Sequence, residues 1–159
     1  MHRGYERDPH GKRSACADGR TERQRPALLL LFAAVGTVIF IAVGGAVGAL
    51  GRYAVVTASA GTWGASHYGT LLVNIVGSLL MGLIVEGISL GADVSEGVRL
   101  ALVVGLLGAF TTFSAFSLDV FNLYDDGRLI AAAVYASASV ALSVGALFAG
   151  IALARALAV

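Results

Sequence analysis

The chain has 159 residues, of which 57 % are hydrophobic and 13 % are charged, and its mean hydropathy is +0.82. Soluble globular domains carry about twice that share of charge, so the composition excludes an ordinary soluble domain. The formal net charge of +1 hides an uneven distribution, because seven of the eleven lysines and arginines precede Pro26. The remaining four are Arg52, Arg99, Arg128 and Arg155. The single cysteine, Cys16, excludes an intramolecular disulfide.

Residues 1–25 are charged, lack hydrophobic periodicity and are too polar to form a core. A signal peptide also places a basic stretch before an apolar one, but the apolar run from Ala27 is too long for one. We therefore expect a disordered basic N-terminal tail over residues 1–25 and a four-helix membrane domain over residues 26–159.

The first predicted span covers residues 27–51, a run of 25 residues without charge that is long enough to cross about 30 Å of hydrocarbon. Gly44 and Gly48 lie four apart and form a small-residue face that lets another helix approach closely. Arg52 is expected to end the span, either as an interfacial anchor or as a residue that guides anions into a vestibule. Residues 57–68 are expected to form a loop.

The second predicted span covers residues 69–90 and contains Asn74. A carboxamide inside a membrane is costly unless it is hydrogen-bonded. Asn74 therefore either bonds to a neighbouring helix or offers its N–H groups to an anion without adding fixed charge. Ser78 lies one turn further on and shares its face. Glu86, near the end of the span, is expected at the interface.

The third predicted span, residues 98–123, is a poor continuous helix. Gly105 and Gly108 weaken it, and the hydroxyls of the Thr111-Thr112 pair compete for backbone hydrogen bonds. A break at mid-membrane leaves carbonyl groups that can hold a cation and amide groups that favour an anion. Phe113 and Phe116 follow on one helical face, with the hydroxyls of Thr112, Ser114 and Ser117 close by. This stretch is the predicted ion site.

The fourth predicted span covers residues 129–157. Tyr135, Ser139 and Ser143 recur every four residues along it, a pattern more typical of helix packing than of a conduction track. The fold class expected is an all-α integral membrane protein with four transmembrane helices, the third of them broken at mid-membrane.

The four arginines of the body are divided equally between the two sides of the membrane. Arg99 and Arg155 fall on one side, and Arg52 and Arg128 on the other, so the body has almost no orientation bias under the positive-inside rule. Such a chain can insert both ways and form an antiparallel dual-topology dimer. The basic tail, in contrast, favours a cytoplasmic N-terminus.

Three motifs make the chain recognisable: Gly44-Gly-x-x-Gly-Ala-x-x-Arg52-Tyr53, Gly69-Thr-Leu-x-Val-Asn74-x-x-Gly77 and Gly105-x-x-Gly-x-x-Thr-Thr-Phe-Ser-x-Phe-Ser117. In this order, over roughly residues 43–135, they resemble the CrcB/Fluc family of fluoride channels. The resemblance implies an antiparallel dimer with two fluoride pores and one structural sodium ion at the dimer centre. The sodium ligands that it implies are the backbone carbonyls of Gly108 and Thr111.

The resemblance also implies that the edges of two phenylalanine rings contact fluoride, because an aromatic edge is positive and holds a small anion weakly enough to release it. The predicted pore residues are Asn74, Thr112, Phe113, Ser114, Phe116 and Tyr135, with Arg52 as the vestibule or anchor residue. Two positions depart from the family pattern: Ala115 replaces a common threonine, and Asp119 replaces a common glutamate.

The expected function is passive, selective export of fluoride through a homodimer in the plasma membrane, with fluoride, sodium and the lipid bilayer as partners and no nucleic acid. An enzyme is not expected, because His67, the only histidine outside the tail, is placed in a loop without a nucleophile beside it. One alternative is a silent or half-active subunit of a heterodimer with a homologous chain. A proton-coupled four-span drug exporter is a weaker one, because the first span lacks an acidic residue.

Overall fold

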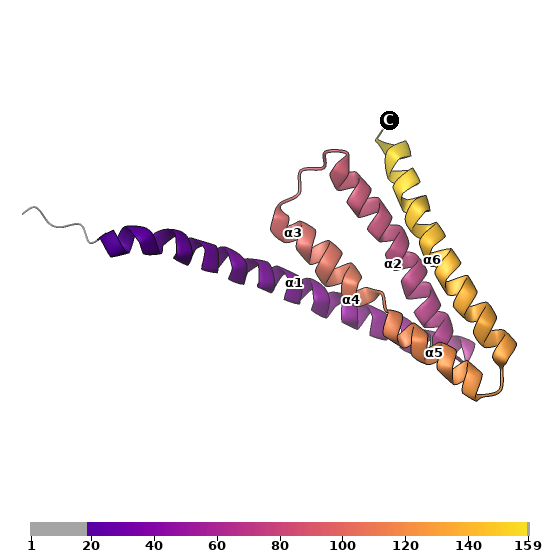
Figure 1. Ribbon diagram of the computed structural model, residues 1–159. Helices are drawn as coiled ribbons and strands as arrows, with labels where there is room; N and C mark the ends of the chain where they lie inside the picture. The colour runs from indigo at the N-terminus through magenta and orange to yellow at the C-terminus, as the bar shows by residue number, and fades with distance from the viewer. Residues whose placement is uncertain (1–18, 159) are drawn as a thin grey trace, which may run out of the picture. The chain divides into compact units, whose positions relative to one another are not determined.

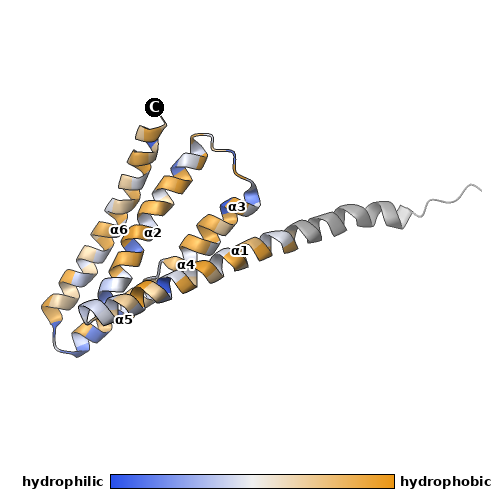
Figure 2. Ribbon diagram, turned by 180° about the vertical axis from the view of Figure 1, so that it is seen from behind, coloured by the Kyte–Doolittle hydropathy of each residue, from blue (hydrophilic) through white to orange (hydrophobic). Residues whose placement is uncertain are grey.

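Helices long and apolar enough to cross a membrane make up almost all of the described chain. The computed structural model describes the backbone of residues 19–158 and the side chains of residues 34–158. Four segments in it meet the length and hydropathy of a membrane span (Figure 2). They are Ala34–Trp63, Ser66–Ser89, Glu96–Asp125 and Leu129–Leu157. The chain divides into two compact units, residues 1–34 and 35–159, and the contacts below lie within the second.

The helical elements follow each other with short connections (Figure 1). In chain order they are α1 (Gly19–Trp63), α2 (Ser66–Ser89), α3 (Glu96–Leu100), the π-helix η1 (Ala101–Leu107), α4 (Gly108–Phe110), α5 (Phe113–Asp125) and α6 (Leu129–Leu157). The all-α class and the four spans agree with the sequence analysis. The second and third spans begin and end within three residues of the predicted bounds, and the fourth matches them.

The first span differs from its prediction. The prediction ends at Gly51, but α1 continues to Trp63, so the loop expected over residues 57–68 is wrong apart from Gly64 and Ala65. The polar side chains there do not end the helix, because they bond back to it: Thr62 Oγ1 donates to a carbonyl one turn before it, at 2.7 Å. The turn itself is at Gly64, whose φ of 74° favours glycine.

The predicted tail is covered only in part. Residues 1–18 lie outside the described residues, whereas residues 19–25 form the first turns of α1. Arginine, glutamate and glutamine are good helix formers, and α1 continues through Pro26 into the apolar segment.

The glycine face predicted on the first span is a close helix contact. A Cβ atom at Gly44 would overlap the carbonyl oxygen of Ala101, and one at Gly48 would overlap that of Leu106. From the opposite side, a Cβ at Gly105 would come within 2.6 Å of the Ile41 carbonyl oxygen. The backbones of α1 and η1 therefore touch, which only glycine at these positions allows.

A second pair of glycines joins α2 to α6. A Cβ at Gly82 would overlap the carbonyl of Leu147, and one at Gly150 would overlap that of Leu79. These two helices lie side by side in both ribbon views (Figures 1 and 2). The close approach fixes the face of α6 that is turned towards α2.

Two ion pairs lie near the α2–α3 end of the molecule. Arg155 Nε of α6 contacts Glu86 Oε1 of α2 at 2.7 Å, and Arg99 pairs with Glu96 within the first turn of the third span at 2.6 Å. Glu86, expected at the interface, therefore ties α2 to α6.

Candidate ion site at the interruption of the third span

The third span is interrupted at Thr111 and Thr112. Helix α4 ends at Phe110 and α5 begins at Phe113. Between them, Thr111 has φ −79° and ψ 158°, and Thr112 has φ −154° and ψ 128°, so both are extended. A π-helix of seven residues, η1, precedes the interruption and is separated from it by the three residues of α4. Such π-helical turns occur frequently at functional sites.

Asn74 of α2 bonds to the interruption with both ends of its carboxamide. Its Oδ1 accepts a hydrogen bond from the backbone N–H of Thr112 at 2.8 Å, and its Nδ2 donates to the Thr112 carbonyl at 3.0 Å. The Asn74 oxygen thus takes the Thr112 N–H, which has no helical acceptor at the interruption, and the Asn74 N–H adds a bond to the carbonyl of Thr112, the N-cap of α5. One N–H of the carboxamide is used in this way and one remains for another acceptor.

The interruption frees two particular carbonyls. In an uninterrupted helix each N–H donates to the carbonyl four residues earlier, so the N–H of Thr112 would serve Gly108. It donates to Asn74 instead. Likewise the N–H of Ala115, which would serve Thr111, donates to Thr112 Oγ1 at 3.2 Å. The carbonyls of Gly108 and Thr111, the predicted sodium ligands, have therefore both lost their helical donors.

The Thr111 hydroxyl is already used within the helix. Thr111 Oγ1 donates to the Leu107 carbonyl at 2.9 Å. This fixes the hydroxyl proton within the helix, and the backbone oxygen of Thr111, which has lost its helical donor, is the predicted cation ligand. Backbone carbonyls are hard oxygen ligands and suit a hard cation. Within the part of the chain that the structure describes, no group of three or more His, Cys, Asp or Glu side chains could hold a metal.

A cavity of about 450 Å³ opens beside the interruption. It is bounded by α2, by both sides of the break and by α6. Its lining residues are Asn74, Ser78, Gly108, Thr111, Thr112, Phe113, Phe116, Ser139, Val140, Ser143 and Val144. Four of the six predicted pore residues are among them. Ser114 and Tyr135 are not, although the Ser114 hydroxyl lies 3.2 Å from that of Thr112.

Two lining residues were assigned to helix packing from the sequence alone. The hydroxyl oxygens of Ser139 and Ser143 are buried, yet neither makes a hydrogen bond. The Ser139 hydroxyl lies near that of Tyr135, but the Tyr135 hydroxyl bonds to Asp119. A buried hydroxyl that serves helix packing is normally hydrogen-bonded to a neighbour. The unbonded hydroxyls of Ser139 and Ser143 therefore fit a cavity-lining role better than a packing role. The four-residue spacing was the signal that marked them.

Aromatic rings run from the cavity into the core. The centroids of Phe113 and Phe116 lie 5.3 Å apart, and those of Phe116 and Tyr135 lie 5.8 Å apart. Phe113 is 76 % exposed, whereas Tyr135 is 7 % exposed and packs with Leu123. The Tyr135 hydroxyl donates to Asp119 Oδ2 at 3.2 Å, so the shorter acid at this position still reaches a partner.

Arg52 does not end a helix. It lies 11 residues before Trp63, the last residue of α1, and its side chain is half-buried. Its predicted roles as an anchor or as a vestibule residue both remain predictions.

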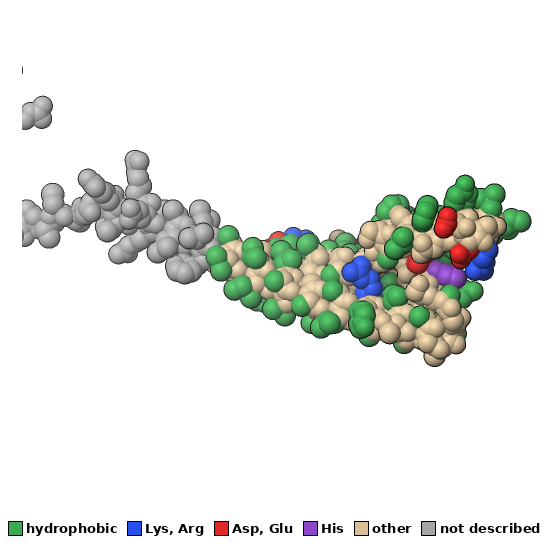
Figure 3. All heavy atoms as spheres, turned by 90° about the horizontal axis from the view of Figure 1, so that it is seen from below, with side chains coloured by type: hydrophobic (Ala, Val, Ile, Leu, Met, Phe, Trp, Pro, Cys, Tyr) green, Lys and Arg blue, Asp and Glu red, His purple; other side chains and the backbone are tan. Residues whose placement is uncertain are grey.

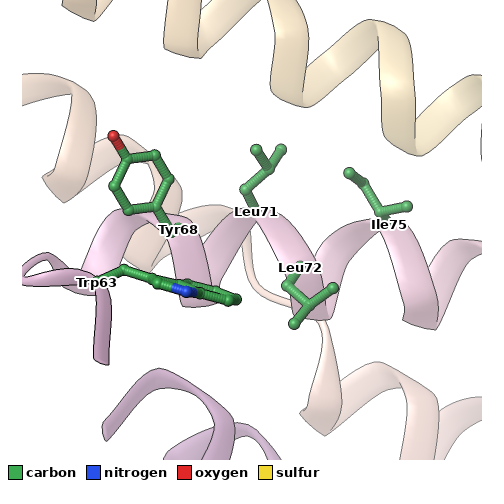
Figure 4. Close-up of a pocket in the computed structure, with 5 residues that line it drawn as sticks. All are labelled: Trp63, Tyr68, Leu71, Leu72 and Ile75. Atoms are coloured by element: carbon green, nitrogen blue, oxygen red, sulfur yellow. The ribbon is translucent and has the colours of Figure 1, made fainter. Parts of the chain in front are cut away.

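Another pocket lies at a different place and has different chemistry. It measures about 540 Å³ and is lined by Trp63, Tyr68, Leu71, Leu72 and Ile75 (Figure 4). This apolar lining offers little to a small hydrated anion. The polar cavity at the interruption is therefore the candidate ion site, although it is the smaller of the two.

The four spans and the cavity define a multi-pass α-helical membrane protein with a partly polar cavity beside the interruption of its third span. A comparison with known families identifies it further: residues 39–151 match the model of the CrcB-like protein, Camphor Resistance (CrcB) family. The chain belongs to this family.

Relatives of the chain carry a more specific name. Proteins named fluoride-specific ion channel FluC from Rhizobium etli and from Chelativorans sp. are 45 % identical over 125 residues and 49 % identical over 119 residues. A third, from Rhodopseudomonas palustris, is 44 % identical over 122 residues. These matches cover 74–76 % of this chain and 95–98 % of the relatives.

Proposed function

We propose that the chain is a fluoride-selective ion channel that exports fluoride passively across the plasma membrane. The observation that carries this proposal is the polar cavity at the interrupted third span, in a chain of the CrcB family whose relatives are named fluoride-specific channels. Fluoride crosses membranes as its neutral weak acid and ionises inside the cell. An inside-negative potential then drives the anion out with about 2.3 kcal/mol per charge per 100 mV.

The cavity offers an anion several weak contacts rather than one strong site. The unused N–H of Asn74 and the free hydroxyls of Ser139 and Ser143 are neutral donors. The rings of Phe113 and Phe116, which also line the cavity, have positive edges. Conduction needs contacts that replace water but release the ion again, and neutral donors with ring edges provide that.

The interruption is proposed to lie at mid-membrane and to bind one structural sodium ion at the centre of an antiparallel, dual-topology dimer. The freed carbonyls of Gly108 and Thr111 support this proposal, because their N–H partners are engaged elsewhere. Two carbonyls from one chain do not complete the shell of a cation, whereas two chains supply four. The sodium would supply charge that fixes both interruptions in place.

Two features bear on the alternatives. The lining of the cavity contains no aspartate or glutamate, and Glu86 is paired with Arg155, so the chain lacks the cavity carboxylate that a proton-coupled drug exporter needs. A heterodimer with a homologous chain stays the second candidate. It is favoured by the basic residues before Pro26, which bias the chain towards one orientation.

Fluoride accumulation in bacteria that lack their own fluoride exporter tests the proposal in cells. Expression of this chain should lower intracellular fluoride and restore growth in fluoride medium, most clearly at acid pH. The control is Asn74→Asp, expressed to the same level. Equal fluoride accumulation with and without the chain, at matched membrane expression, would contradict the proposal.

A further inference from the structure

His67 lies against the aromatic path that leads out of the cavity. The sequence placed it in a loop, but it is in the first turn of α2 and is half-buried. Its ring centroid is 5.5 Å from that of Tyr135, in an edge-to-face arrangement with an interplanar angle of 76°. It is also 4.3 Å from the ring of Tyr68.

Tyr135 connects this histidine to the cavity. Its ring contacts Phe116, which lines the cavity and in turn contacts Phe113. A single aromatic ring, that of Tyr135, thus lies between His67 and the wall of the candidate fluoride path. The proposed conduction path does not use His67. The ring of Tyr135, which lies between His67 and that path, carries no charge of its own.

Histidine is the side chain whose charge changes between about pH 5 and 8. A positive charge roughly 10 Å from an anion, in surroundings between protein and water in polarity, raises the local anion concentration roughly two- to tenfold. Of the groups packed against His67, Tyr68 and Tyr135 are neutral. The carboxylate of Asp119 accepts the hydrogen bond of the Tyr135 hydroxyl and is a charged group on the far side of that ring.

The surface at this end of the molecule has the same mixed character. Figure 3 shows a histidine beside acidic and basic side chains at one end of the face in view, with apolar side chains around them and further basic side chains nearer the middle. The histidine is therefore within reach of water and of protons from the medium.

We propose that His67 is a positioning residue that raises fluoride flux as the medium becomes acid. It attracts the anion towards the cavity across Tyr135 without touching it. The inference rests on the proposed fluoride channel function. The charge on His67 gives that channel its highest fluoride flux in acid medium. In the same condition the neutral weak acid loads a cell with fluoride fastest.

The test is fluoride efflux from vesicles containing the full chain, measured with a fluoride electrode between about pH 8 and pH 6. Protein-free vesicles at each pH give the leak of the neutral acid, which is subtracted. Flux through the wild-type chain, at fluoride below saturation, should rise roughly threefold on acidification. The rise should shrink at high salt, because the charge is then screened.

Two substitutions separate charge from packing. Fluoride flux through His67→Gln should equal, at every pH, the wild-type flux measured at about pH 8. Fluoride flux through His67→Lys should equal, at every pH, the faster wild-type flux measured in acid. Ser66→Ala, on the same turn, should keep the rise. Three results would overturn the inference and leave the channel function standing. They are a rise that survives in His67→Gln, wild-type flux that does not change with pH, and a wild-type rise that is insensitive to salt. Wild-type vesicles without flux at any pH would overturn both.

Discussion

The carboxamide of Asn74 and the backbone of Thr112 form a pair of reciprocal hydrogen bonds, 38 residues apart in the chain. The two bonds pair the N–H and the carbonyl of the extended Thr112. The Thr112 N–H therefore does not donate to the carbonyl of Gly108. The same side chain therefore holds the interruption open and keeps one N–H for an anion. Structural and functional roles, which are alternatives from the sequence alone, are compatible at this residue.

Asn74→Asp should reduce both stability and flux. A carboxylate cannot donate to the Thr112 carbonyl, and its charge repels an anion in the cavity. Losing this hydrogen bond should cost about 0.5–1.5 kcal/mol in the free energy of unfolding. Denaturation in detergent followed by circular dichroism measures this cost, and vesicle efflux measures the flux. Ser78→Ala, on the same face and without a hydrogen bond to Thr112, is the matched control. A stable Asn74→Asp protein with wild-type flux would refute the dual role.

Phe113→Ile and Phe116→Ile should separate ring chemistry from packing. An aliphatic side chain has no positive rim, so the anion loses a contact. A loss of about 1.4 kcal/mol at the barrier slows flux tenfold. Because Phe113 is 76 % exposed, its replacement should leave stability nearly unchanged, whereas Phe116→Ile also loses a contact with Tyr135. If Phe113→Ile forms folded dimers that conduct like the wild type, the ring acts in packing alone.

Removal of sodium should weaken the dimer and leave anion selectivity unchanged. In sodium-free buffer with a large organic cation, size-exclusion chromatography should show dissociation at concentrations where the sodium form stays dimeric. Thr111→Ser should be mild, because the proposed ligand is a backbone carbonyl and serine keeps a hydroxyl for the Leu107 carbonyl. Gly108→Ala should also be mild, since the added Cβ meets its nearest neighbour at 3.6 Å. Unchanged dimer stability and flux without sodium would exclude the assignment.

Gly44→Ala should disrupt the contact between α1 and η1. The added Cβ would overlap the Ala101 carbonyl, which belongs to backbone and cannot move aside, at a cost of about 1–3 kcal/mol. Gly145→Ala is the control, because nothing lies within 4 Å of its Cβ position. Unfolding in detergent should show a large loss for the first substitution and none for the second. Equal stabilities would mean that these backbones do not touch.

Cysteine labelling should show which orientations the chain adopts. After replacement of Cys16, single cysteines at the exposed positions Ser66 and Asp126 should report one side of the membrane and a cysteine at Asp93 the other. Label from both sides at each position indicates dual topology. A single orientation with full activity from this chain alone would exclude the antiparallel homodimer.

The number of spans and the place of the interruption follow from simple properties of the sequence. Long uncharged runs set the spans. Of the four residues singled out for weakening the third helix, Thr111 and Thr112 leave it, whereas Gly105 and Gly108 stay helical. The length of α1 does not follow in the same way. Arg52 and the polar residues after it suggest an interface, but a helix continues through such residues when their side chains bond back to it.

The partners of individual side chains needed coordinates. Sequence spacing puts Tyr135, Ser139 and Ser143 on one face of α6, but it does not say whether that face meets a neighbour or a cavity. The rotation of α6 is set by the Gly82 and Gly150 contacts with α2, and these depend on the whole bundle. For the same reason, the sequence indicated Asn74 as a candidate residue but did not identify Thr112 as its hydrogen-bond partner.

Fluoride efflux from vesicles that contain this chain as the only protein tests the central claim most directly. Vesicles are loaded with the potassium salt of fluoride or chloride, and efflux begins when a potassium ionophore lets K⁺ leave together with the anion. The account predicts rapid fluoride efflux above the protein-free leak, little chloride efflux, and a loss of flux of about tenfold or more in Phe116→Ile. Equal efflux of the two anions, or no fluoride efflux from correctly folded dimers, would contradict it.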